Sequence, residues 1–154
     1  MPKREGGTTR SEIVTVRTDP KMKYALELAA RRHRRTISSF VEWAVDRAFD
    51  EIETEHLLGR NRNTFRELIS MVWDVDPPDR LLKLAEHQPS LMTFEEEKIH
   101  KAIRETDWMN TDDSAGFSLV LLDKVRECWD QLLKVGEGKL DTKDLVDPDS
   151  KETN

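Results

Sequence analysis

The residues best suited to binding chemistry cluster between positions 31 and 38. A basic run, Arg31-Arg32-His33-Arg34-Arg35, directly precedes a threonine that can cap a helix. The exposed N–H groups at a helix N-terminus attract anions such as phosphate, and guanidinium groups bind phosphate too. The segment is therefore a candidate phosphate-binding site, although an ordinary N-cap beside a solvated basic surface is the simpler alternative. Its candidate residues are Arg34, Arg35, Thr36, Ile37 and Ser38.

The net charge of -6 hides a division of charge along the 154 residues. Residues 1–49 hold eleven Lys and Arg against six Asp and Glu, a net charge of +5. Residues 50–154 hold fourteen against twenty-five, a net charge of -11. A basic N-terminal part followed by an acidic remainder favours a polyanionic partner for residues 1–49, with nucleic acid first among the candidates.

Other chemistry finds little support in the sequence. The four histidines, His33, His56, His87 and His100, are not placed at metal-ligand spacing. The single cysteine, Cys128, excludes internal disulfides and is interpreted as a core residue. We find no phosphate-binding glycine loop, dinucleotide fingerprint or nucleophile elbow. We therefore expect no metal, no cofactor and no enzymatic activity.

The elements that position the basic run begin with a short β-branched segment. Alternation over residues 13–18 places Val14, Val16 and Thr18 on one face of a predicted strand, opposite Ile13, Thr15 and Arg17. A lone strand cannot satisfy its own backbone groups, and no hairpin partner lies nearby. The simplest partner is the same strand of a second chain, paired across a two-fold axis.

Two helices follow this strand. Asp19 and Pro20 are a typical N-cap and first residue, and the basic run at the end of the helix suits its C-terminus. The second helix is expected to begin after Thr36 and to run to about Leu58, before Gly59. Each helix carries one apolar stripe at helical spacing. The two stripes are Met22, Ala25, Leu26, Ala29 and Ala30, then Phe40, Val41, Ala44, Val45, Ala48, Phe49 and Ile52.

Beyond Gly59 the pattern predicts helices and no further strand. The expected helices span 64–73, 80–87 after a cap at Asp79, 94–106 after a capping box of Thr93 and Glu96, and 118–135. The fold class is therefore mainly α. We expect a flexible basic arm at 1–11, a first domain at 12–58, an all-helical region at 59–135, and an acidic disordered tail at 136–154.

Residues 12–50 resemble the ribbon-helix-helix family of DNA-binding domains, which includes Arc, MetJ and CopG. The resemblance lies in VTVRTDPKMKYALELAARRHRRTISSFVEWAV: the V-x-V-R-x-D-P opening, the apolar spacing, the T-x-S start of the second helix and the F-V-x-x-A-V stripe. It covers about a quarter of the chain. It implies a homodimer whose second-helix turn anchors the DNA backbone. The family often has glycine at the position of Arg34.

In such a dimer the paired strands form a ribbon that fits the DNA major groove. Val14, Val16 and Thr18 would then face the helices, which leaves Ile13, Thr15 and Arg17 to contact base edges. Arg17 is the strongest candidate because a guanidinium can bind the O6 and N7 of guanine together. An exposed strand arginine with no such role is the alternative.

We therefore expect a cytoplasmic, nucleoid-associated regulator of bacterial or phage type. It would bind double-stranded DNA as a dimer, with a tetramer on DNA as an option, and repress transcription. The region 59–135 is expected to serve oligomerisation, a protein partner or a ligand. An antitoxin of a toxin–antitoxin pair and a plasmid-segregation protein that binds a centromere-like site remain alternatives. No apolar run reaches the length of a membrane span.

Overall fold

The computed structural model describes residues 12–54, 63–112 and 118–151, and the chain is mainly α-helical as predicted. The α-helices are α1 (Pro20–Arg32), α2 (Ile37–Glu51), α3 (Phe65–Val72), α4 (Pro77–His87), α5 (Phe94–Glu105), α6 (Leu122–Glu127) and α7 (Trp129–Gly136). The strands are β1 (Glu53–Thr54), β2 (Asn63–Thr64), β3 (Asn110–Asp112) and β4 (Ser118–Val120). Short 3-10 turns are η1 (Pro89–Leu91), η2 (Asp107–Met109), η3 (Thr142–Asp144) and η4 (Pro148–Lys151).

The chain divides into an N-terminal unit that ends at Arg47 and a C-terminal unit that begins at Ala48. The boundary lies inside α2, earlier than the predicted boundary at residue 58. The end of α2 joins the C-terminal unit through side chains: Asp50 accepts from Arg66 Nε at 2.6 Å, and the rings of Phe49 and Phe65 lie 5.4 Å apart.

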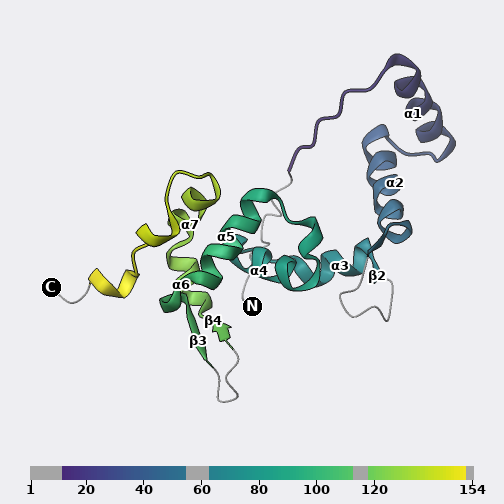
Figure 1. Ribbon diagram of the computed structural model, residues 1–154. Helices are drawn as coiled ribbons and strands as arrows, with labels where there is room; N and C mark the ends of the chain where they lie inside the picture. The colour runs from purple at the N-terminus through teal and green to yellow at the C-terminus, as the bar shows by residue number, and fades with distance from the viewer. Residues whose placement is uncertain (1–11, 55–62, 113–117, 152–154) are drawn as a thin grey trace, which may run out of the picture. The chain divides into compact units, whose positions relative to one another are not determined.

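The N-terminal unit contains α1 and the part of α2 up to Arg47, joined by a short turn (Figure 1). The N-cap predicted at Asp19 is confirmed, because its carboxylate accepts from the N–H of Met22 at 2.8 Å, and Pro20 occupies the first turn. The second helix does not run to Leu58. It ends at Glu51 and β1 follows.

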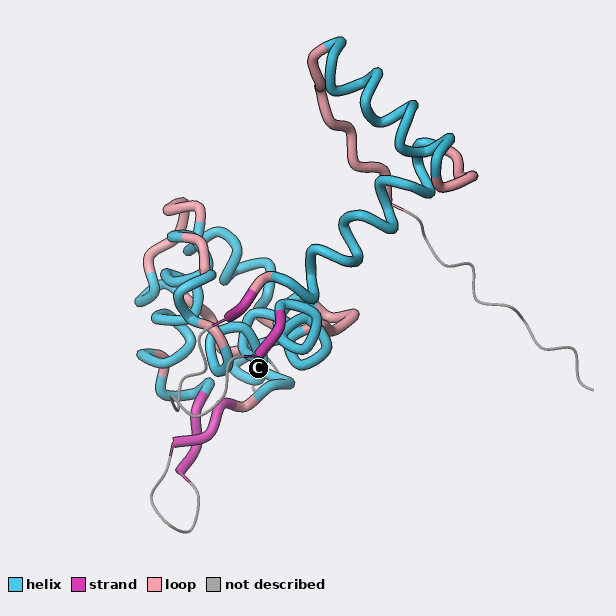
Figure 2. Tube along the Cα trace, turned by 90° about the vertical axis from the view of Figure 1, so that its right-hand side faces the viewer, coloured by secondary structure: helices cyan, strands magenta, loops and turns pink. Residues whose placement is uncertain are grey.

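The strand predicted at residues 13–18 is not formed in the single chain. Residues 12–19 have no strand assignment, and Figure 2 shows them as a loop that leads into α1. The physical reason is that a strand forms only when another strand accepts and donates its backbone hydrogen bonds, and the described part of the single chain places no such strand beside this segment.

Side-chain caps define the first helices of the C-terminal unit. The predicted capping box of α5 is confirmed: Glu96 N–H donates to Thr93 Oγ1 at 3.2 Å, and Thr93 N–H donates to Glu96 Oε2 at 2.7 Å. Thr64 and Glu67 form the same arrangement at α3. The cap predicted at Asp79 is wrong, because α4 begins earlier, after Asp76. Asp79 is instead buried.

The core of the C-terminal unit is a single cluster of apolar side chains. Helix α5 packs against α7, and α3 against α4. At the α5–α7 contact a Cβ on Gly136 would lie 2.9 Å from Ile99 Cδ1, so a larger residue there would require the Ile99 side chain to shift. Cys128 lies in this core, as the sequence predicted. The cluster comprises Leu81, Ile99, Ala102, Ile103, Met109, Val125, Cys128, Leu132, Val135 and Leu145.

The prediction of an all-helical region at 59–135 is wrong in two places. Strands β1 and β2 pair antiparallel, and so do β3 and β4, which form the hairpin that projects from the helices in Figure 1. The helix predicted over 118–135 therefore begins as a strand and then breaks at Cys128 between α6 and α7. Strands of two or three residues are too short for alternation to reveal them.

The prediction of a disordered tail at 136–154 is wrong for residues 137–151. Leu145 is only 9% exposed and joins the core. Lys124 Nζ donates to Asp147 and Asp149, each at 2.6 Å, which lowers the pKa of the Asp147 carboxyl and raises that of Lys124. Gln131 Oε1 also accepts a hydrogen bond from the backbone N–H of Val146 at 3.0 Å. One apolar anchor and these polar contacts order a segment whose composition alone suggests disorder.

Neighbouring residues of this segment provide a test of its packing. Leu145→Ala should lower the free energy of unfolding by about 2–4 kcal/mol, because it removes a buried side chain from the core. Val146→Ala should cost less than about 1 kcal/mol, because that side chain is 44% exposed. Urea denaturation of the full chain measures both. If both substitutions were silent, the segment would not belong to the core.

Candidate nucleic-acid interface

The turn between α1 and α2 is a helix C-cap with an arginine in the left-handed conformation. Arg34 has a φ of 54°, and its N–H donates to Arg31 O at 3.0 Å. The next N–H, that of Arg35, donates to Ala30 O at 2.9 Å. These two bonds form a Schellman motif, in which glycine is the usual left-handed residue. The turn therefore keeps the backbone shape expected for glycine although the side chain is arginine.

Helix α2 begins immediately after this turn. Thr36 Oγ1 accepts from Ser39 N–H at 3.2 Å, which confirms the predicted cap. The carbonyl oxygen of Thr36 accepts from Phe40 N–H at 2.9 Å. The N–H groups of Ile37 and Ser38 lie in the first turn, where a helix provides no acceptor for them, and both residues are exposed. This end of α2 thus presents two backbone donors and a positive dipole to solvent.

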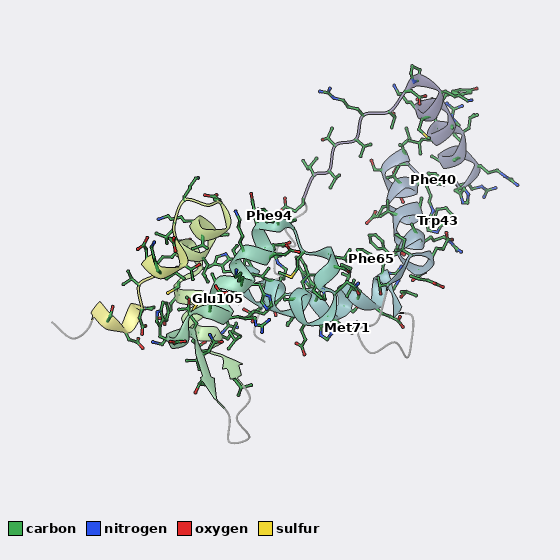
Figure 3. All side chains as sticks on the ribbon, viewed as in Figure 1. Phe40, Trp43, Phe65, Met71, Phe94 and Glu105 are labelled. Carbon is green, nitrogen blue, oxygen red and sulfur yellow. The ribbon has the colours of Figure 1, made fainter. Side chains whose placement is uncertain are left out.

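Two guanidinium groups of this unit lie over one aromatic ring, that of Trp43. The guanidinium of Arg35 lies 5.3 Å from the ring centre of Trp43, and that of Arg47 lies 5.8 Å from it. The ring of His33 lies 4.8 Å from that of Trp43 in a tilted arrangement. The ring of Phe40 lies 5.6 Å from that of Trp43 on the same helix, and Figure 3 labels both residues. Cation–π contacts of this kind restrict where a guanidinium can point.

Sequence reasoning assigned Arg35 to the site but missed Arg47 and Trp43. The spacing of four between Trp43 and Arg47 places both on one face of α2, so this pair was detectable. The contact of Arg35 with Trp43 was not detectable from the sequence, because the conformation of the turn brings the two side chains together. Arg31, which belongs to the same basic run as Arg35, forms an ion pair with Glu27 at 3.8 Å.

The three predicted base-contacting residues lie in the exposed segment before α1. Ile13 is 90% exposed, and Thr15 and Arg17 are exposed as well. The opposite face, predicted to be covered, is equally open: Val14 is 85% exposed and Val16 is 74% exposed. In the single chain nothing distinguishes the two faces, so the roles of Ile13, Thr15 and Arg17 stay predictions.

The N-terminal unit buries almost none of its apolar surface. Ala30 is the one buried apolar side chain among the described residues of this unit. Exposed apolar residues instead follow helical rows with a spacing of four: Tyr24 and Leu28 on α1, and Ile37, Val41 and Val45 on α2. Rows of this kind on two neighbouring helices indicate surfaces that another element covers.

The comparisons with known proteins add no relative. No family model, no curated protein and no solved structure matches this chain. Within the described ranges, no group of three or more potential ligand side chains is placed to hold a metal ion. No helix of those ranges is both long and apolar enough to cross a bilayer.

The left-handed backbone conformation of Arg34 predicts a substitution that increases stability. Arg34→Gly should raise the free energy of unfolding by about 0.5–1 kcal/mol, because glycine adopts positive φ without the clash that Cβ causes. Arg32→Gly is the matched control. It removes the same side chain from the last residue of α1 and should destabilise the protein by about 1 kcal/mol. Urea denaturation compares the two, and a loss of stability in Arg34→Gly would contradict the observed turn.

Proposed function

We propose that this protein is a sequence-specific DNA-binding repressor that acts as a ribbon-helix-helix homodimer. The observation that carries the proposal is the uncovered apolar surface of the N-terminal unit, which lies beside a basic turn.

The need for a second copy follows from burial. A helical hairpin with one buried apolar side chain lacks the hydrophobic free energy to offset its loss of conformational entropy. A two-fold arrangement would place the rows on α1 and α2 against those of the partner. It would also give the segment 13–18 an antiparallel strand to pair with.

The face that remains for DNA follows from this pairing. If Val14, Val16 and Thr18 cover the helices, Ile13, Thr15 and Arg17 point outward along a two-stranded ribbon. Such a ribbon fits the major groove, where Arg17 can bind guanine and Thr15 can bond a base or contact a thymine methyl. Ile13 offers only an apolar contact.

The phosphates would be held at the turn and the start of α2. Ile37 and Ser38 supply backbone donors, and Thr36 fixes the first turn. Arg34 and Arg35 supply charge, with Arg35 oriented by Trp43. The strained backbone of Arg34 is consistent with a role for its side chain, because strain of this kind is concentrated at functional positions.

The acidic C-terminal unit suits a different task from DNA binding. Its net charge of -11 opposes contact with phosphates, so DNA would meet the N-terminal unit alone. Repression would then result from occupancy of an operator that polymerase needs. One ribbon covers a short site, so we expect two dimers on adjacent half-sites.

Selection from random duplex DNA at two salt concentrations tests the proposal. The expected result is an enriched palindromic or repeated motif whose spacing gives the number of dimers. Binding that is unselective and steeply salt-dependent would reduce the N-terminal unit to a basic surface on phosphates and would overturn the proposal.

Two substitutions separate base contact from phosphate contact. Arg17→Ala should cost about 1–3 kcal/mol on the selected site and little on random DNA. Arg34→Gly should weaken binding to both DNAs alike and reduce the salt slope by about 1 for each lost phosphate contact. Titrations with both duplexes measure this. Equal losses on both DNAs for Arg17→Ala would make Arg17 a phosphate contact.

A further inference from the structure

The C-terminal unit carries an apolar groove at the surface of its core. The groove has a volume of about 560 Å³ and is lined by residues of α3, α4, α5 and α7. Its apolar lining includes Ile69, Trp73, Leu84, Leu91, Trp129 and Leu133. The lining also includes Leu81 and Ile99 of the core cluster and the buried residues Leu68 and Val72, and Trp129 packs against the cluster.

The groove is too open to enclose a small molecule. Trp73 is 63% exposed, and Ile69, Leu91 and Leu133 are exposed too. Sites for small ligands bury most of the ligand surface. An open apolar groove between helices is instead typical of a surface that receives an amphipathic helix, whose apolar residues repeat at spacings of three and four.

The charges at the edge of the groove indicate the sign of the partner. Glu95 and Glu96 line it, and Glu97 follows in the same first turn of α5. Glu95 makes no ion pair with any residue in the described part of the chain, and Glu96 accepts from Thr93 N–H in the capping box. The one cation of the lining, Arg80, lies 4.9 Å from the Trp73 ring centre, and Lys98 lies 4.5 Å from that of Phe94.

We propose that this groove binds an amphipathic helix of another protein that carries lysine or arginine beside its apolar face. The apolar face would cover Trp73 and Leu133, and the cations would meet Glu95 and Glu96. A second copy of the groove is a poorer occupant, because it would bring another set of unpaired carboxylates into the same interface. The proposal uses only the C-terminal unit, so it stands independently of DNA binding.

The test uses three designed peptides of about 18 residues, a length that gives roughly five helical turns. The first has leucines at helical spacing and lysines elsewhere. The second has the same composition in scrambled order, and the third has glutamates in place of the lysines. Fluorescence anisotropy of labelled peptide at a concentration where it is monomeric measures binding to the full chain. We expect the first peptide alone to bind, in the micromolar range.

Variants of the chain locate the binding site. Trp73→Ala should weaken binding of the first peptide by about tenfold or more, because a large aromatic contact is lost. Leu119→Ala, an exposed apolar residue of β4 outside the groove, should leave it unchanged. Glu95→Lys should weaken binding by about three- to tenfold, whereas Glu127→Lys, which changes charge equally outside the groove, should have little effect.

Four results would overturn the proposal. The first is no binding of the lysine peptide, and the second is equal binding of the scrambled or glutamate peptide. The third is an equal loss for Glu95→Lys and Glu127→Lys, which would indicate general charge attraction. The fourth is a self-associated chain that Trp73→Ala dissociates, measured by sedimentation, because a second copy would then fill the groove.

Discussion

Burial of apolar surface is the constraint on which the N-terminal unit depends. Two helices and a preceding segment leave Ala30 as the one buried apolar side chain among the described residues of that unit, while Val14 and Val16 lie open. Folding must offset about 1–2 kcal/mol of backbone entropy per ordered residue, and this burial does not suffice. In the proposed dimer the same deficit becomes an advantage, because one shared core would couple folding, strand pairing and DNA binding.

The C-terminal unit satisfies the same constraint by itself. Ile103, Met109, Val125 and Leu132 are fully buried, and the segment around Leu145 closes the core. This unit therefore has no need of a second copy for stability. The apolar groove beside Trp73 lies at the surface of that core and carries the acidic edge. Its acidic charge distinguishes the proposed partner site from the basic turn that is proposed to meet DNA.

Local signals in the sequence were sufficient for most helix starts. Asp19, Thr36 and Thr93 each act as the N-cap that their side chains predicted, because a cap depends only on a few neighbouring residues. The errors lie where distant residues decide. The β3–β4 hairpin, the break at Cys128 and the ordered segment around Leu145 all depend on tertiary packing that no local pattern encodes.

In the candidate site, too, the features set by neighbouring residues were predictable and those set by distant residues were not. The residues of the turn that is proposed to bind phosphate were predictable because Thr36 to Ser38 and the arginines are contiguous in the sequence, whereas the left-handed backbone is an observation on Arg34 itself. The contact between Arg35 and Trp43 was not predictable, because the turn brings them together. The base-contacting role of Ile13, Thr15 and Arg17 depends on a second chain and stays a prediction.

The most direct test of the account is whether residues 13–18 pair between two chains. A sample that mixes isotope-labelled and unlabelled protein permits nuclear Overhauser effects to be measured between chains only. The account predicts interchain contacts between Cα protons along Val14 to Val16, in an antiparallel register, and a dimer by sedimentation. A monomer without such contacts would contradict it, because the apolar rows of α1 and α2 would then be stable in water without a partner.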